Sequence, residues 1–179
     1  WIAILDTLVV IPFAYLRVEI INKAIMRAIE YEYQQYISVK NYVYSIDDSK
    51  RIHIGETGWS SVANELYGSD GTKAADELKQ GIYFKKITDL CASLSISCFY
   101  FSAFDEPWKD SNNPEGSENH FGLFTVDGKA KYALWDSVND GLFKGLKRPN
   151  KIIKTFDGDL NALMETVYLP PVNVEDGHQ

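Results

Sequence analysis

Apolar residues in the first third of the chain follow first a strand-like and then a helix-like pattern. Residues 5–15 are rich in β-branched and aromatic side chains, which predicts a buried strand ended by Pro12. In residues 19–36 the apolar positions recur at helical spacing on one face, so a helix is predicted there. Residues 41–50 are more polar and are expected to form a loop.

The middle of the chain repeats this order. Residues 51–56 predict a short strand, and a helix is expected from about 73 to 94 with Thr72 as its cap. Residues 96–104 form the strongest strand pattern of the sequence. This run is apolar on both faces, which is typical of a parallel sheet covered by helices.

The last third contains a long loop and a final helix. Residues 105–119 carry prolines and glycine and predict a loop, whereas residues 130–143 predict a helix. Residues 145–179 show little periodicity and are interpreted as a tail with one short helix near 160–166. The resulting order of strand, helix, strand, helix, strand, helix predicts a βα repeat and a parallel sheet.

Composition narrows the class of protein. With 179 residues, 45% hydrophobic and 24% charged, the chain is expected to form one globular domain with a sizeable core. The net charge of −7 argues against a nucleic-acid partner and against an anionic membrane surface. The apolar run before Leu16 is too short and too interrupted to span a bilayer. The aromatic content of 13% fits core packing or a cleft that stacks sugar rings, and composition alone favours core packing.

Metal and cofactor chemistry has no pattern in the sequence. Cys91 and Cys98 make neither a disulfide framework nor a ligand motif, and the three histidines are scattered. We therefore expect reduced thiols, no metal and no cofactor.

Carboxylates follow two of the predicted strands, at the sheet edge where parallel α/β folds carry their function. Glu56 is followed by Trp59, and Glu106 is followed by Trp108. An aromatic ring stacks on the apolar face of a pyranose, while a carboxylate attacks the anomeric carbon or holds hydroxyls. A capping carboxylate and a solvated loop of charges are the simpler interpretations of the same residues.

Three motifs extend this pattern. Residues 55–61 read Gly-Glu-Thr-Gly-Trp-Ser-Ser, residues 104–109 read Phe-Asp-Glu-Pro-Trp-Lys followed by Glu-Asn-His-Phe-Gly-Leu-Phe at 118–124, and residues 127–132 read Asp-Gly-Lys-Ala-Lys-Tyr. In order and spacing they resemble glycoside hydrolase family 17, the β-1,3-glucanases. The likeness covers about residues 50–145 well.

This resemblance implies a (β/α)8 TIM barrel, of which the chain supplies about the last three βα units. Glu56 is then the nucleophile at the end of the seventh strand of a retaining laminarin-type β-1,3-glucan hydrolase. The acid/base glutamate of the family belongs to the fourth strand and is missing from this chain. Retaining chemistry needs two carboxyl groups about 5–5.5 Å apart, so the fragment alone is expected to be inactive without the N-terminal part of the barrel.

The resemblance also implies a set of substrate-binding residues. Lys109 is expected to form an ion-pair network with the two glutamates of the set. The set consists of Trp59, Glu106, Trp108, Lys109, Glu118 and Phe121. Residues 1–145 are interpreted as the C-terminal part of the catalytic domain and residues 146–179 as a C-terminal tail.

The chain departs from the family at two positions. Ser60 stands where members usually have proline, and Ile11 precedes Pro12 where they commonly have tyrosine. A non-catalytic glucan-binding or structural remnant of such a barrel therefore remains an alternative, and a scaffold without sugar affinity is a weaker one. For the full-length parent we expect a secreted, periplasmic or cell-surface location, which is not readable from this chain.

Overall fold

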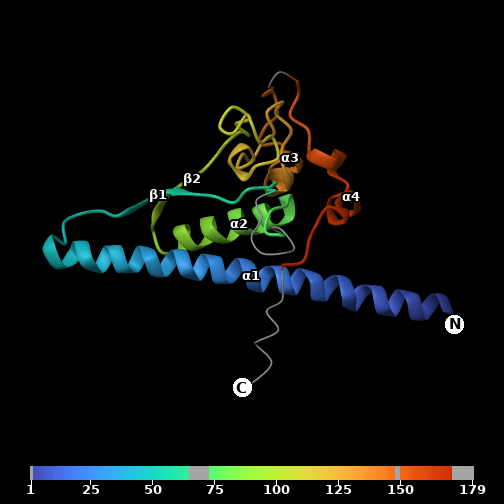
Figure 1. Cartoon of the computed structure of the whole chain (residues 1–179), viewed down its shortest axis with the longest axis horizontal. Coiled ribbons are helices and arrows are strands. Elements are labelled where there is room, and N and C mark those ends of the chain that lie inside the picture. Colours follow the sequence, from blue (N-terminus) through green and yellow to red (C-terminus); the bar gives the residue numbers. More distant parts are fainter. Residues whose placement is uncertain (1, 65–72, 148–149, 171–179) are drawn as a thin grey trace.

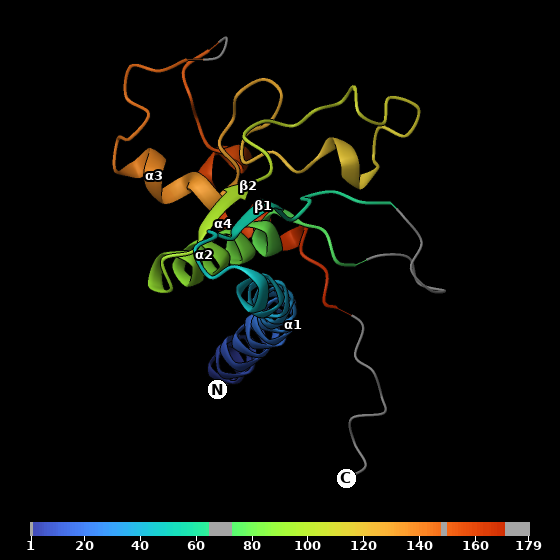
Figure 2. The same cartoon turned by 90° about the vertical axis from the view of Figure 1, so that its left-hand side faces the viewer.

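The fold is a stack of helix, helix and sheet with irregular segments above it (Figure 1). The computed structural model describes residues 2–64, 73–147 and 150–170, and for residues 2–16 it describes the backbone alone. Helix α1 (Ile2–Ile46) lies at the base, and α2 (Glu77–Ser93) lies between α1 and the strands β1 (His53–Thr57) and β2 (Ser97–Tyr100). Seen along α1, the same three layers remain separate (Figure 2).

The two strands are parallel neighbours joined by α2, which makes a βαβ unit. His53 pairs with Ser97 and Ile54 with Cys98. The predicted strand at 51–56 and the predicted parallel pairing are therefore confirmed. The strand predicted at 96–104 is regular only over β2, and beyond it Phe104 forms a single parallel bridge with Phe124.

The core lies between α1 and α2 and includes one residue from the C-terminal segment. It is built from Ile21, Ile25, Ile29, Leu78, Tyr83, Ile87, Cys91 and Val167. Helix α2 begins at Glu77 because Asp76 caps it, with the Asp76 carboxylate accepting from the Lys79 backbone N–H at 2.8 Å. The helix thus starts four residues later than predicted, and Thr72 lies outside the described residues.

The N-terminal predictions need correction. The backbone is helical from Ile2 to Ile46, so the strand predicted at 5–15 is wrong and the loop predicted at 41–50 begins only after Ile46, whereas the helix at 19–36 is confirmed and longer. β-branched content favoured a strand, but such propensity is a weak guide that tertiary context overrides. Two of the three predicted strands are present in the described part of the chain.

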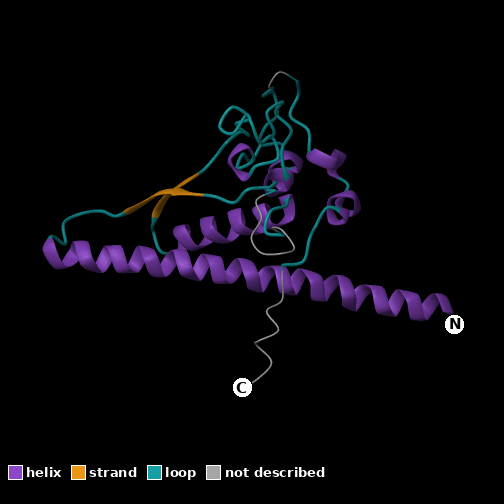
Figure 3. Ribbon diagram, viewed as in Figure 1, coloured by secondary structure: helices purple, strands orange, loops and turns teal. Residues whose placement is uncertain are grey.

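Short elements dominate the C-terminal half (Figure 3). They are the 3-10 turns η1 (Ser117–Asn119), η2 (Tyr132–Leu134) and η3 (Thr155–Gly158) and the helices α3 (Trp135–Asn139) and α4 (Leu160–Glu165). The helix predicted at 130–143 is shorter because Ala130 is extended, donating its N–H to Ile153 O at 2.8 Å and accepting from Thr155 N at 2.9 Å.

The short helix predicted near 160–166 is confirmed as α4. It is not detached from the domain, because Leu163 is 0% exposed and Val167 belongs to the core. Buried Lys79 also donates from Nζ to Tyr168 O at 2.6 Å. The boundary placed at residue 145 stays a prediction. Within the described ranges, no helix combines the length and apolarity that crossing a membrane requires.

Candidate active site

The end of β1 is anchored to both helices through Thr57. Its buried hydroxyl lies 3.0 Å from Glu32 Oε2 on α1 and 2.7 Å from the Tyr83 hydroxyl on α2. Tyr83 also donates to Glu32 Oε2. Burial, followed by this hydrogen bond to Glu32, raises the pKa of the Tyr83 phenol. The Thr57 side chain therefore faces the helical layers.

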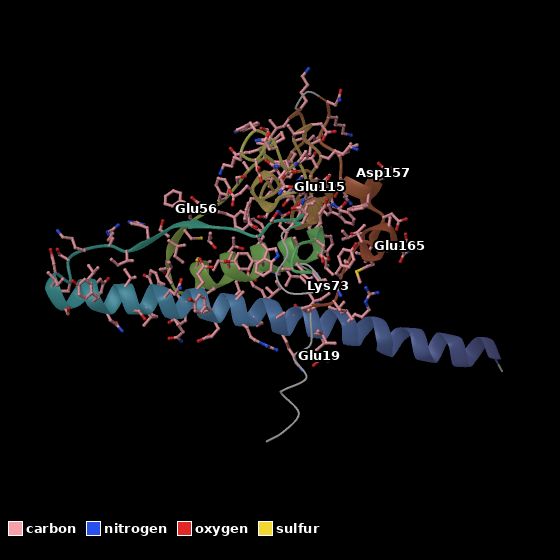
Figure 4. The ribbon with its side chains drawn as sticks, in the orientation of Figure 1. Glu19, Glu56, Lys73, Glu115, Asp157 and Glu165 are labelled. Atoms are coloured by element: carbon pink, nitrogen blue, oxygen red, sulfur yellow. The ribbon has the colours of Figure 1, made fainter. Side chains whose placement is uncertain are left out.

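Glu56 is exposed beside the buried Thr57. Together with Ile52 and Ile54 it lines a hollow of about 210 Å³ against Glu32 and Tyr36 of α1. The register changes between Ile54 and Thr57, since Thr57 pairs with Tyr100 and β1 carries one more residue than β2 there. Such bulges re-aim side chains and are common beside active sites. Figure 4 labels Glu56 on the β1 strand, above α1 and away from Asp157 and Glu165.

The residues after Glu56 pass very close to the segment after β2. Phe101 N donates to Thr57 O at 2.7 Å. A Cβ on Gly58 would collide with Phe101 O, so this position admits only glycine without a backbone shift. Trp59 then turns toward the start of α2, and its indole N–H donates to Ala74 O, three residues before that helix, at 2.9 Å. Its ring centroid lies 5.1 Å from that of Tyr83, so this predicted sugar-binding residue is half-buried against the helix.

Two serines tie the segment after β1 to the loop around η1. The buried Ser60 hydroxyl lies 2.6 Å from Val62 O and 3.0 Å from Ser117 O. Ser61 donates to His120 O from its N–H at 3.0 Å and from its hydroxyl at 3.1 Å. The serine at the family's proline position is thus a hydrogen-bonded part of the site's frame.

A buried ion pair lies directly under this loop. Lys131 Nζ is 2.7 Å from Asp105 Oδ1 and 2.7 Å from the Ser61 hydroxyl, and its side chain is 2% exposed. Gly122 N donates to the same carboxylate oxygen at 3.0 Å. Burial lowers the pKa of Lys131 and the Asp105 carboxylate opposes that shift.

The buried pair was not predicted as part of the site. Asp105 directly precedes Glu106, and Lys131 lies in the motif at 127–132. The nearness of both residues to the motifs was the signal in the sequence that they could belong to the site. It does not reveal that their side chains meet although they lie 26 residues apart in sequence.

Glu106, Lys109 and Phe121 are brought together around Phe101. Lys109 Nζ lies 3.5 Å from Glu106 Oε2 and 3.9 Å from the centre of the Phe101 ring, which lies 5.8 Å from the Phe121 ring. The Lys109–Glu106 half of the expected ion-pair network is present. In the described part of the chain, Glu118 forms no ion pair within 4.0 Å, so the expected link from Lys109 to Glu118 is absent.

The loop at residues 110–119 is held together by the hydrogen bonds of one buried side chain. Buried Asn119 accepts from Asp110 N at 2.9 Å and donates to Asp110 O at 2.9 Å and to Asn113 O at 3.0 Å. His120 contacts Pro114 O at 2.7 Å through Nε2, and its Nδ1 lies 3.9 Å from Asp105 Oδ2. The Asp105 carboxylate raises the pKa of His120. Trp108 is 63% exposed on this loop.

Metal chemistry has no support in this arrangement. Among the described residues, no group of three or more His, Cys, Asp or Glu side chains is placed to hold a metal ion. A hollow of about 530 Å³ lies beside α2, η2 and α3, and none of the predicted site residues lines it. The candidate site comprises Glu56 at the end of β1 and, two residues further on, Gly58 against Phe101 and Phe121, with Lys109 over the Phe101 ring.

Comparison with known proteins identifies the family of the chain. The family described as glycosyl hydrolases family 17 matches residues 12–135. An endo-laminarinase from Formosa is 53% identical, with a TM-score of 0.82 over 87% of this chain and 40% of its own. A glucan 1,3-beta-glucosidase of Arthroderma benhamiae is 39% identical over 100 residues, which are 51% of this chain and 30% of the relative. The chain thus spans well under half the length of these relatives.

The fold class follows from the same comparisons. Members of the family have a (β/α)8 barrel, and β1, α2 and β2 form one parallel unit of that barrel. The family contains β-1,3-glucan hydrolases and glucanosyltransferases that act with retention of configuration. The chain belongs to glycosyl hydrolases family 17.

Proposed function

We propose that the complete protein containing this chain hydrolyses laminarin-type β-1,3-glucan, with Glu56 as the nucleophile. The observation that carries this proposal is the placement of Glu56, exposed at the bulged end of β1 beside the anchored Thr57. The similarity to an endo-laminarinase and to a glucan 1,3-beta-glucosidase supports the substrate.

The chemistry is a double displacement. The Glu56 carboxylate attacks the anomeric carbon while a second carboxylic acid protonates the departing glycosidic oxygen. Water then enters with the help of that second residue, releases the sugar from Glu56 and restores the original configuration. We propose that the second glutamate lies outside this chain, in the N-terminal part of the barrel. The 179 residues alone would then bind glucan without cleaving it.

The neighbouring groups provide the contacts for sugar. Exposed Lys109 and half-buried Glu106 form a donor and acceptor pair for hydroxyl groups, beside the apolar rings of Phe101 and Phe121. Exposed Trp108 offers a further ring face on the same loop. Glu118, which has no ion-pair partner among the described residues, is left to accept hydrogen bonds from sugar hydroxyls. Trp59 supports the site from the side of α2 through its ring contact with Tyr83.

Hydrolysis of laminarin by the complete protein tests the proposal. Release of reducing ends should fall by at least about 10³-fold in Glu56→Gln, because loss of a nucleophile removes the covalent step. Glu115→Gln, an exposed change on the loop before η1, is the control and should retain full activity. Full activity in Glu56→Gln would show that another residue attacks the sugar.

Glucan binding without turnover is the second candidate. Its support is the cluster of Glu106, Lys109 and Phe121, which exists independently of Glu56. Calorimetric titration with laminari-oligosaccharides separates the outcomes when it is combined with the assay above. Binding without cleavage by the complete protein favours a binding module, whereas no heat and no cleavage favour a scaffold.

A further inference from the structure

Gln80 is a fully buried amide on α2 that points at the candidate site. It lies in the first turn after the Asp76 cap and is 0% exposed. Its Nε2 lies 2.9 Å from Trp59 O and 3.1 Å from Gly122 O. Two further carbonyls of the same region, those of Phe121 and His120, lie at 3.3 and 3.5 Å.

The two shortest contacts join two separate loops. A carboxamide nitrogen has two N–H donors, so it can serve one carbonyl of each loop at the same time. Trp59 O belongs to the loop that follows Glu56, and Gly122 O belongs to the segment that carries Phe121. Helix α2 lies beneath the strands, as Figure 2 shows. The Gln80 amide, fixed on this helix, therefore sets the distance between the two loops.

Packing alone does not account for this residue. Gln80 Oε1 is buried and has no hydrogen-bond partner among the described residues, and burying an unpaired carbonyl is unfavourable. Methionine has a similar length and would fill the same volume without that cost. What methionine lacks is the pair of N–H donors that hold the loops together.

We propose that Gln80 is a positioning residue, which fixes the loop after Glu56 against the segment of Phe121 through one amide group. The consequence for catalysis rests on the proposed function, since it assumes that Glu56 attacks a glucan held beside Phe121. Near-attack geometry is sensitive to displacements of about 1 Å, so a loosened loop lowers turnover even when the protein remains folded.

The test compares Gln80→Met with Cys91→Ala in the complete protein. Cys91 is buried on the same helix, about three turns further along, and among the described residues its side chain makes no hydrogen bond to either loop. Both variants remove a buried contact of α2 and are expected to lower the melting temperature. Gln80→Met should also lower kcat on laminarin by about 10-fold or more with a smaller change in KM, whereas Cys91→Ala should keep kcat within about twofold.

Hydrogen exchange provides a readout that does not depend on activity. Ser61 N and Gly122 N are hydrogen-bonded to His120 O and Asp105 Oδ1; Ser61 lies two residues after Trp59, and Gly122 is itself held by Gln80 through its carbonyl. We expect faster exchange at both amides in Gln80→Met and unchanged exchange in Cys91→Ala.

Each result has a separate meaning. Unchanged exchange and unchanged kcat in folded Gln80→Met would overturn the positioning role. Wild-type protein that leaves laminarin intact would contradict the proposed function instead, while the exchange measurement would still decide the role of Gln80. If Gln80→Met does not fold, Gln80→Asn keeps the amide but retracts it by one methylene, and should show the same loss of kcat and of protection in weaker form.

Discussion

Lys131 Nζ and Asp105 Oδ1 lie 2.7 Å apart in the interior. Asp105 lies on the segment that follows β2, whereas Lys131 directly precedes η2. Lys131 also donates to the Ser61 hydroxyl, so it holds the loop that carries Glu106 in position against the segment that follows the candidate nucleophile. The ion pair therefore belongs to the frame of the candidate site, and the groups proposed to face the sugar lie outside it.

Breaking this pair should be costly. Lys131→Met leaves Asp105 buried without its cation, so the free energy of unfolding should fall by about 3–5 kcal/mol. Lys109→Met removes the exposed partner of Glu106 and should cost less than about 1 kcal/mol. Denaturant unfolding of both variants measures the difference. Equally small losses of unfolding free energy in the two variants would mean that the Lys131–Asp105 pair does not stabilise the site.

The hydroxyl cluster under Thr57 gives a second prediction. Tyr83→Phe removes the hydroxyl shared by Thr57 and Glu32, and should lower the free energy of unfolding by about 1–3 kcal/mol. Tyr31→Phe, at a position 68% exposed on α1, is the matched change and should be nearly neutral. Thermal melts with the two variants side by side check this, and a neutral Tyr83→Phe would be the contrary outcome.

His120 should make stability depend on pH. Its folded pKa is raised above the ordinary 6.5 by the Asp105 carboxylate, with burial and Lys131 opposing. The charged imidazole therefore contributes fully below about pH 6.5, and the contribution is lost as pH rises through the raised pKa. Unfolding of wild type and His120→Gln between about pH 5 and 9 should show the largest difference at the acidic end. A difference that grows toward alkaline pH would contradict this sign.

The C-terminal helix should be required for folding. Leu163 is 0% exposed, so Leu163→Ala should lower the free energy of unfolding by about 2–5 kcal/mol. Leu160, on the same helix, is 51% exposed, and Leu160→Ala should change it by less than about 0.5 kcal/mol. Similar effects of the two variants would indicate that residues after 145 form a separate tail.

Local motifs were predicted from the sequence better than long-range contacts. The strand around Glu56 was predicted because its apolar positions and the following Gly58 are adjacent in the chain. The strand predicted at 5–15 is helical in the structure, because β-branched residues also occur in helices and their strand propensity is a weak guide. Helix α2 begins at Glu77 after the cap Asp76, and both Asp76 and Thr72 are residue types that cap helices.

Buried polar partners were the part of the site that spacing did not reveal. Gln80 and Gly122 are 42 residues apart, and Ser61 and Lys131 are 70 residues apart. Their pairing depends on how the sheet and α2 are stacked, which no short motif encodes. The residues that face the sugar in the proposed function were named from the sequence, whereas the residues that hold them in place required the fold.

Covalent trapping tests the role of Glu56 most directly. A 2-deoxy-2-fluoro laminaribiosyl fluoride slows release of the glycosyl-enzyme, so the attacking carboxylate of the complete protein stays labelled. Trypsin cleaves after Arg51 and Lys73, and the peptide 52–73 contains Glu56 and Glu65. Fragment-ion mass spectrometry should place the sugar on Glu56. A label on Glu65 or on another peptide, or turnover of laminarin with no labelled peptide, would contradict the assignment of Glu56 as nucleophile.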